Sequence, residues 1–143
     1  MAQLSVGQAV RNAIAAELAA ATFYKRLGEQ TEDAAAKRFL ANMALAEEAH
    51  ARDIEKMASR LTAELPVNAD RLACVMETAP GWEWAEDVSL QEALQIALEA
   101  EHSAALFYGA VADALQGDGK QFFEGLAATE AEHARLISEH LVA

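Results

Sequence analysis

The amino-acid sequence predicts an all-α protein, a four-helix bundle made of two duplicated helical hairpins that are joined by a long crossover. Both prolines, Pro66 and Pro80, fall within one stretch in the middle of the chain. The sequence on either side is rich in Ala, Leu, Glu and Gln, which are strong helix formers. One pattern of polar and aromatic residues also occurs in both halves. We expect residues 1–143 to form a single domain.

The first hairpin is predicted from its helix start signals. Ser5 and Gln8 match a capping box and begin a helix at about 5–30. Residues 31–33, which are Thr, Glu and Asp, are typical of a helix N-terminus, so a second helix is expected at about 32–63. Because the two helices are nearly contiguous, they should pack as antiparallel neighbours.

The second hairpin shows the same kind of signals. A capping box at 89–92 begins a helix that is expected at about 89–116. Gly117 and Gly119 mark a tight break before a fourth helix at about 119–142. This short connection again predicts an antiparallel pair.

Residues 64–88 form the long crossover link. A helix of about 26 residues is roughly 39 Å long, and an extended link of this size can span about twice that distance. The link can therefore run along the bundle and make the second and third helices parallel. Trp82 and Trp84 in the link most simply cover apolar bundle surface, with a partner contact or a lid over the site as the alternative. The link also allows two chains to exchange hairpins, so a homodimer is expected.

Composition excludes several classes of partner. The net charge of −12 argues against binding to nucleic acid or to an anionic membrane, which both require a basic face. Cys74 is the only cysteine, which excludes a disulfide framework and a CxxC site for zinc or rubredoxin-type iron. The sequence has neither a signal-peptide pattern nor an apolar run that approaches the roughly 18 residues of a membrane span. We therefore expect a cytoplasmic location.

The repeated pattern is a Glu followed by Phe-Tyr six and seven residues later, and then, in the next helix, Glu-x-x-His-x-Arg. The first part occurs as ELAAATFY (17–24) and EHSAALFY (101–108), and the second as FLANMALAEEAHAR (39–52) and FFEGLAATEAEHAR (122–135). Six polar residues of the pattern fall in the apolar stripe of their helix, near its middle: Glu17, Glu47, His50, Glu101, Glu130 and His133. We expect their side chains to converge at one level of the core.

Four buried carboxylates require a counter-charge. Each buried ion costs several kcal/mol unless it is paired, whereas a whole domain is stable by only about 5–15 kcal/mol. No Lys or Arg lies in the four apolar stripes, so two divalent cations are the simplest way to neutralise the carboxylates. Oxygen donors with a few imidazoles favour iron or manganese over zinc, which prefers His and Cys, and over calcium, which takes oxygen ligands.

With two Glu-x-x-His motifs, each accompanied by a Glu on another helix, the chain resembles the ferritin-like superfamily and most closely its rubrerythrin branch. The resemblance covers all four predicted helices. It implies that the metal ligands are Glu17, Glu47, His50, Glu101, Glu130 and His133. It also implies that Tyr24 and Tyr108 lie beside the metals, where they would hydrogen-bond ligands or supply a proton during catalysis.

The resemblance implies a centre of two Fe ions, with Mn or a mixed metal pair as an alternative. The expected activity is that of a rubrerythrin-like peroxidase or ferroxidase, which oxidises Fe(II) while it reduces hydrogen peroxide or dioxygen. Such a protein needs an external electron donor.

The sequence also departs from the family pattern. Rubrerythrins typically carry a second Glu three residues after the third-helix ligand, a position that is Ala104 in this chain. We expect no rubredoxin domain within residues 1–143, since Cys74 is their only cysteine. Glu48 follows Glu47, where bacterioferritins have a haem-binding Met, so no haem is expected. The sequence predicts four helices and not the fifth helix of cage ferritins, so a storage cage is not expected.

Two other functions stay open. The chain could sequester or deliver iron without efficient turnover, or it could be a metal-free structural bundle with a polar network where a metal site has decayed. Tyr24 and Tyr108 could also be core aromatic residues that are satisfied by one hydrogen bond. We expect exposed or helix-end positions for the side chains outside the stripes, which are Glu48, Glu99, His102, Glu132 and His140, and ion pairs for Arg52 and Arg135.

Overall fold

The computed structural model describes residues 6–58, 89–113 and 115–141. These residues form four α-helices: α1 (Val6–Gln30), α2 (Ala34–Ala58), α4 (Leu90–Asp113) and α5 (Gly117–Leu141). No strand occurs in these ranges. The predicted all-α class is confirmed. The crossover at 64–88, with Cys74, Trp82 and Trp84, lies outside the described residues, as does the predicted end of the second helix at 63.

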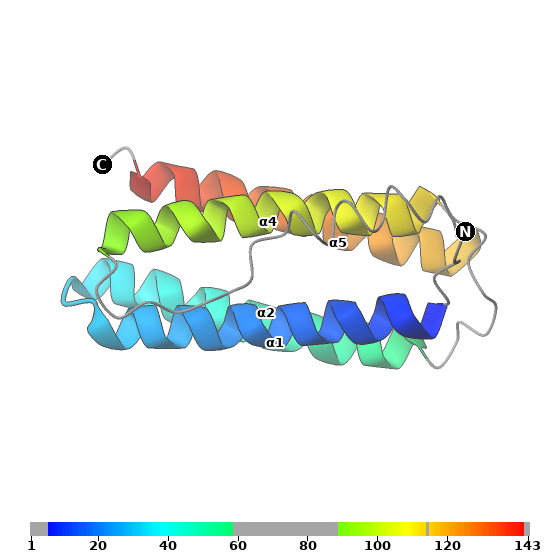
Figure 1. Ribbon diagram of the computed structural model, residues 1–143, viewed down its shortest axis with the longest axis horizontal. Coiled ribbons are helices and arrows are strands. Elements are labelled where there is room, and N and C mark those ends of the chain that lie inside the picture. Colours follow the sequence, from blue (N-terminus) through cyan, green and yellow to red (C-terminus); the bar gives the residue numbers. More distant parts are fainter. Residues whose placement is uncertain (1–5, 59–88, 114, 142–143) are drawn as a thin grey trace.

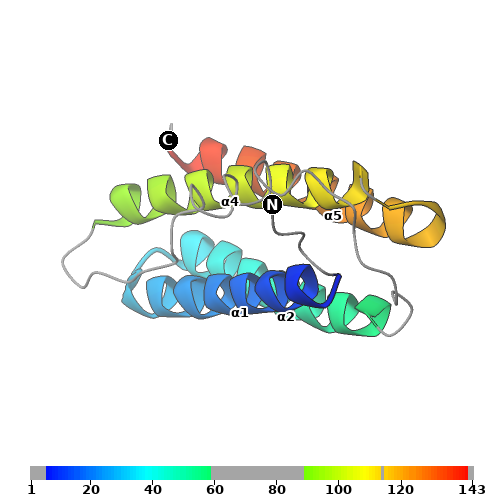
Figure 2. The same ribbon diagram turned by 45° about the vertical axis from the view of Figure 1, so that its right-hand side comes forward.

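The helices form two antiparallel hairpins that lie face to face (Figures 1 and 2). Helix α1 packs on α2, and α4 packs on α5, as the short connections predict. Between the hairpins, α1 is adjacent to α4 and α2 is adjacent to α5. Helices α2 and α4 run in the same direction (Figure 1), which confirms the parallel arrangement that the long link predicts.

The turn between α1 and α2 is closed by residues 31–33, as predicted. The Thr31 hydroxyl is buried and donates to the carbonyl of Leu27 over 2.7 Å, which satisfies an end carbonyl of α1. The backbone N–H of Ala36 donates to Oδ2 of Asp33 over 2.8 Å. Asp33 is therefore the N-cap of α2.

The turn between α4 and α5 differs from the prediction by two to three residues. At the other end of α4, its start, Ser89 and Glu92 form the expected cap, with the Glu92 N–H donating to Ser89 Oγ over 3.1 Å. Helix α4, however, ends at Asp113 rather than 116, and α5 begins at Gly117 rather than 119. Gly117 has a φ of 64°, which a residue with a Cβ rarely adopts, so the chain reverses there and α5 begins at once.

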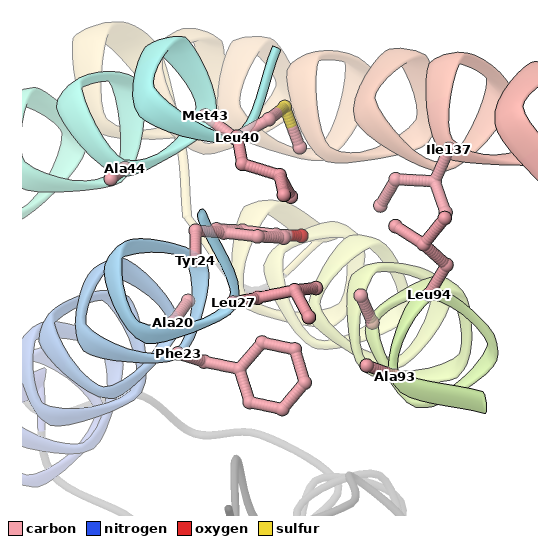
Figure 3. Packing of buried hydrophobic residues seen from close by; sticks show 11 residues of the cluster. Ala20, Phe23, Tyr24, Leu27, Leu40, Met43, Ala44, Ala93, Leu94 and Ile137 are labelled. Atoms are coloured by element: carbon pink, nitrogen blue, oxygen red, sulfur yellow. The ribbon is translucent and has the colours of Figure 1, made fainter. Parts of the chain in front are cut away.

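Two apolar clusters form the core, one toward each end of the bundle. Near the α1–α2 turn, the Tyr24 ring lies between Leu27 and Leu40, and Leu94 and Ile137 face it across the bundle (Figure 3). The other cluster is built from Ala13, Ile54, Phe107, Tyr108, Ala110, Val111, Ala112, Phe123 and Leu126. Each fully buried large side chain contributes about 1.5–3 kcal/mol through removal from water. These clusters stabilise the bundle on both sides of the level at which the repeated polar residues lie.

Candidate metal centre

Six polar side chains fill a layer between the two apolar clusters. They are Glu17 of α1, Glu47 and His50 of α2, Glu101 of α4, and Glu130 and His133 of α5. The four carboxylates are at most 2% exposed, His133 is 7% exposed and His50 is half-buried. The structure therefore brings together all six residues that the sequence places at one level of the core.

The two histidines connect the hairpins. Their rings stack between α2 and α5 with centroids 5.6 Å apart and planes inclined by 15°. Nδ1 of His50 lies 3.1 Å from Oε1 of Glu130 and 3.5 Å from Oε2 of Glu17. Nδ1 of His133 lies 3.0 Å from Oε1 of Glu47. The nearest carboxylate to each imidazole thus belongs to the other hairpin, so the centre is complete only when the hairpins pack together.

The donor atoms form two overlapping sets, each suited to one ion. One set is Glu17, Glu47, His50 and Glu130, and the other is Glu47, Glu101, Glu130 and His133. Within each set the donor atoms lie within 4.8 Å of one another. Two ligands on opposite sides of one ion, each at about 2.1 Å, are about 4.2 Å apart, so little contraction is needed. Glu47 and Glu130 belong to both sets.

Each of the six side chains has one buried polar atom that makes no hydrogen bond within the described residues. These atoms are Oε2 of Glu17 and Glu101, Oε1 of Glu47 and Glu130, and Nδ1 of His50 and His133. A buried polar atom without a partner costs about 1–3 kcal/mol, and more when it is charged. Folded proteins contain few such atoms, and six at one point indicate a site that is built for a ligand. Carboxylate oxygens with imidazole nitrogens fit iron or manganese.

The tyrosines of the repeat lie beside this layer and bond across it. Tyr24 donates to Oε1 of Glu101 over 2.7 Å, and Tyr108 donates to Oε1 of Glu17 over 2.6 Å. Burial, followed by the neighbouring carboxylates, raises the pKa of both hydroxyls well above the usual range, so they stay protonated and remain donors. Each tyrosine occupies one oxygen of a carboxylate and leaves the other oxygen free for an ion.

The carboxylates differ in protonation. Burial, together with the charges of neighbouring carboxylates, raises the pKa of Glu47 to about 12 and that of Glu130 well above its usual value. Burial also acts to raise the pKa of Glu17, but contacts with His50, Glu47 and Tyr108 outweigh it and lower that pKa. Without metal, burial therefore favours the protonated form of the two shared carboxyl groups, while the contacts of Glu17 favour its ionised form.

Most charged residues that flank the motifs point to the surface, as predicted. Glu48 pairs with Lys25 over 3.0 Å, and Arg135 pairs with Glu132 and Glu139. The pairs of Arg135 are exposed and do not reach the centre. These residues therefore contribute little to it, because exposed ion pairs are typically worth less than about 1 kcal/mol.

The remaining histidines lie away from the centre. His102 is exposed. His140 is in the last turn of α5, where its ring stacks on Phe39 with centroids 4.1 Å apart. Ala104 packs against the apolar cluster that contains Tyr108.

Two features of the centre were not predicted from the sequence. One is that each tyrosine bonds to the carboxylate of the opposite hairpin. The other is the stacking of the two imidazoles. The duplicated sequence could have predicted both features, because two like hairpins related by a twofold axis bring equivalent residues face to face.

The fold and the site together define a class of protein: ferritin-like helical bundles with a buried cluster of carboxylates and imidazoles that could hold metal ions. A family model described as Rubrerythrin matches residues 8–91 and 92–143. The chain therefore belongs to the rubrerythrin family. No curated protein and no solved structure matches it significantly. Across the helical residues that the structure describes, none of the helices is both long and apolar enough to cross a membrane.

Proposed function

We propose that this chain is a di-iron carboxylate oxidoreductase that oxidises Fe(II) while it reduces hydrogen peroxide or dioxygen. One observation carries the proposal: six unpartnered donor atoms form two overlapping sets with two shared carboxylates. Membership of the rubrerythrin family supports iron as the metal. Manganese or a mixed pair uses the same kinds of ligand and is the alternative.

In this proposal, Glu17 and His50 would hold one ion, Glu101 and His133 would hold the other, and Glu47 and Glu130 would contribute to both. A bound pair of Fe(II) ions would supply the two electrons that, with two protons, convert hydrogen peroxide to two waters. The raised pKa values of Glu47 and Glu130 mean that both carboxyl groups release a proton when metal binds. Tyr24 and Tyr108 orient the terminal carboxylates and keep a proton close to the reacting oxygens.

The apolar clusters on both sides limit water at the centre. They leave the carboxylates in a low-dielectric layer in which each charge interacts strongly with a cation. Regeneration of Fe(II) after each turnover requires an external electron donor. The proposal also includes a cytoplasmic homodimer, and the long link allows its two chains to exchange hairpins.

The first test is an anaerobic titration of metal-free protein with Fe(II), followed by elemental analysis of the desalted protein. We expect two irons per chain, and we expect addition of peroxide to oxidise them with one peroxide consumed per pair. Absence of retained iron and manganese would overturn the proposal.

A second candidate function is iron sequestration without efficient turnover. Ala104 favours it, because rubrerythrins typically have at this position a Glu that binds when one iron shifts on oxidation. Repeated additions of peroxide with an excess of reductant separate the two functions. An enzyme consumes peroxide in every round, whereas a sequestering protein stops after one filling.

A further inference from the structure

The two sides of the candidate metal centre differ in exposure. On the α1–α4 side, Glu17 and Glu101 are 2% and 0% exposed, and the tyrosine rings beside them are equally buried. On the α2–α5 side, the side chains of His50 and His133 are 13% and 9% exposed. The line along which α2 faces α5, here called the α2–α5 seam, is marked by the ring stacks Phe39–His140 and His50–His133. Solvent therefore comes closest to the centre at this seam.

The exposed part of each imidazole is its outer edge. Nδ1 of His50 and of His133 is buried and faces the carboxylates. The opposite nitrogen, Nε2, has no hydrogen-bond partner in the part of the chain that the structure describes. Metal-binding histidines usually donate this second N–H to a carboxylate or carbonyl, which fixes the ring. Here no hydrogen bond from Nε2 to another described residue fixes either ring in its orientation.

The carboxylates do not have this freedom. Glu17 and Glu101 are held by the hydroxyls of Tyr108 and Tyr24. Glu47 and Glu130 are 1% exposed and lie between the apolar clusters. The imidazoles are therefore the least buried and least constrained of the six side chains.

An exposed carboxylate, that of Asp53, lies near the α2–α5 seam. Asp53 is exposed and lies three residues after His50, so it is on the same side of α2, about one turn away. Its neighbour Ile54 is fully buried and packs into the core. In α5 the position three residues after His133 is Leu136, which is half-buried. The carboxylate at this end of the seam thus comes from the first hairpin.

We propose that divalent cations enter the centre through the α2–α5 seam, where Asp53 attracts the ion and His50 and His133 turn outward to admit it. The inference rests on the proposed function, because it concerns the route to the same two ions. It predicts an entry step whose rate depends on residues that are not ligands.

The test is stopped-flow uptake of Co(II), a redox-stable ion whose visible absorption reports binding, by metal-free full-length protein. Asp53→Asn should slow uptake about threefold at low salt, because one charge near the path is lost, and the difference should shrink as salt screens it. The final number of ions per chain should not change. Glu55→Gln is the matched control, since Glu55 is an exposed carboxylate of the same helix on a different side.

A second pair of variants tests the entry route by placing a larger side chain over it. Ala46 is half-buried and lies one turn before His50, so Ala46→Phe should cover the seam and slow uptake more than Asp53→Asn does. Ala105→Phe, at a half-buried position one turn after Glu101 on the α1–α4 side, is its control and should leave the rate close to wild type. Uptake that is unaffected by Asp53→Asn and Ala46→Phe, or is slowed only by Ala105→Phe, overturns the entry route alone. A wild-type protein that takes up no Co(II), Fe(II) or Mn(II) overturns the proposed function as well.

Discussion

Helices α1 and α4 each contribute a Glu and a Tyr to the centre, whereas α2 and α5 each contribute a Glu and a His. On the α1–α4 side, each carboxylate has one oxygen bonded to a tyrosine of the other hairpin. On the α2–α5 side, burial raises the pKa of the carboxyl groups of Glu47 and Glu130. The difference indicates that tyrosines hold the carboxylates on the α1–α4 side in place, whereas burial disfavours the charged forms of Glu47 and Glu130, which a bound metal would stabilise.

The largest effect should come from removal of both shared carboxylates. Glu47 and Glu130 belong to both donor sets, so the double variant Glu47→Ala/Glu130→Ala should bind neither ion and should lose peroxide-dependent oxidation of Fe(II). Stopped-flow absorbance after peroxide addition and metal analysis of the desalted protein measure the two losses. Unchanged oxidation in this variant would contradict the assignment.

The matched control for this variant is Glu48→Ala/Glu132→Ala. These carboxylates are neighbours of the motif residues but pair with Lys25 and Arg135 at the surface. The control removes the same number of carboxyl groups from the same helices, and it should keep two ions per chain.

Removal of one histidine should cause about half of the loss of bound metal that the Glu47→Ala/Glu130→Ala variant causes. His50 belongs to one donor set only, so His50→Ala should weaken one site and leave the set around His133 able to bind. We expect about one tightly held ion per chain in place of two, measured by elemental analysis after desalting, and His133→Ala should mirror the result. Loss of both ions in either single variant would mean that the two sites form only as a unit.

The fold was predictable because its determinants are local or repeated. The helix start at residues 31–33, the cap at Ser89 and the parallel arrangement of α2 and α4 all follow from turn chemistry or link length. The end of α4 was placed too late, because the conformation of Gly117 is a property of the folded turn that sequence spacing does not reveal.

The six residues of the centre were predictable for a different reason. Polar residues in an apolar stripe, such as Glu47 and His50, are costly unless they share a ligand, and the duplication shows them twice. Which carboxylate each tyrosine contacts depends on how the hairpins face each other, as does the exposure of the imidazole edges. These features concern tertiary packing, and helix periodicity alone does not determine them.

The pH dependence of the metal-free protein should be opposite to that of a typical acidic protein. Glu47 and Glu130 have a higher pKa in the folded state than in the unfolded chain, so the folded state binds more protons and its stability falls as pH rises above about 4.5. Each such group lowers the free energy of unfolding by at most about 1.4 kcal/mol per pH unit. Glu17, whose pKa is lowered, acts in the other direction and offsets part of the loss.

Thermal unfolding in a chelating buffer between pH 5 and pH 8 measures this effect. We expect the melting temperature to fall with pH in the metal-free protein and the fall to disappear when metal is bound, because bound metal replaces the protons. In Glu47→Gln the slope of the metal-free protein should be smaller. A metal-free protein that becomes more stable toward pH 8 would show that the shared carboxyl groups are ionised without metal.

The smallest effect should come from the tyrosines, and it tests the α1–α4 side of the comparison. Tyr24→Phe keeps the ring in its apolar cluster but removes the hydrogen bond to Glu101, so we expect a loss of about 1–3 kcal/mol in the free energy of unfolding, the typical cost of leaving a buried acceptor without its donor. Tyr108→Phe should give a similar loss, because its bond to Glu17 is equivalent. Both variants should still bind two ions. A double-mutant cycle of Tyr24→Phe with Glu101→Gln, followed by urea unfolding, isolates the bond. A coupling energy near zero would mean that the tyrosines only fill space, and that the α1–α4 carboxylates depend on metal as much as those of α2 and α5.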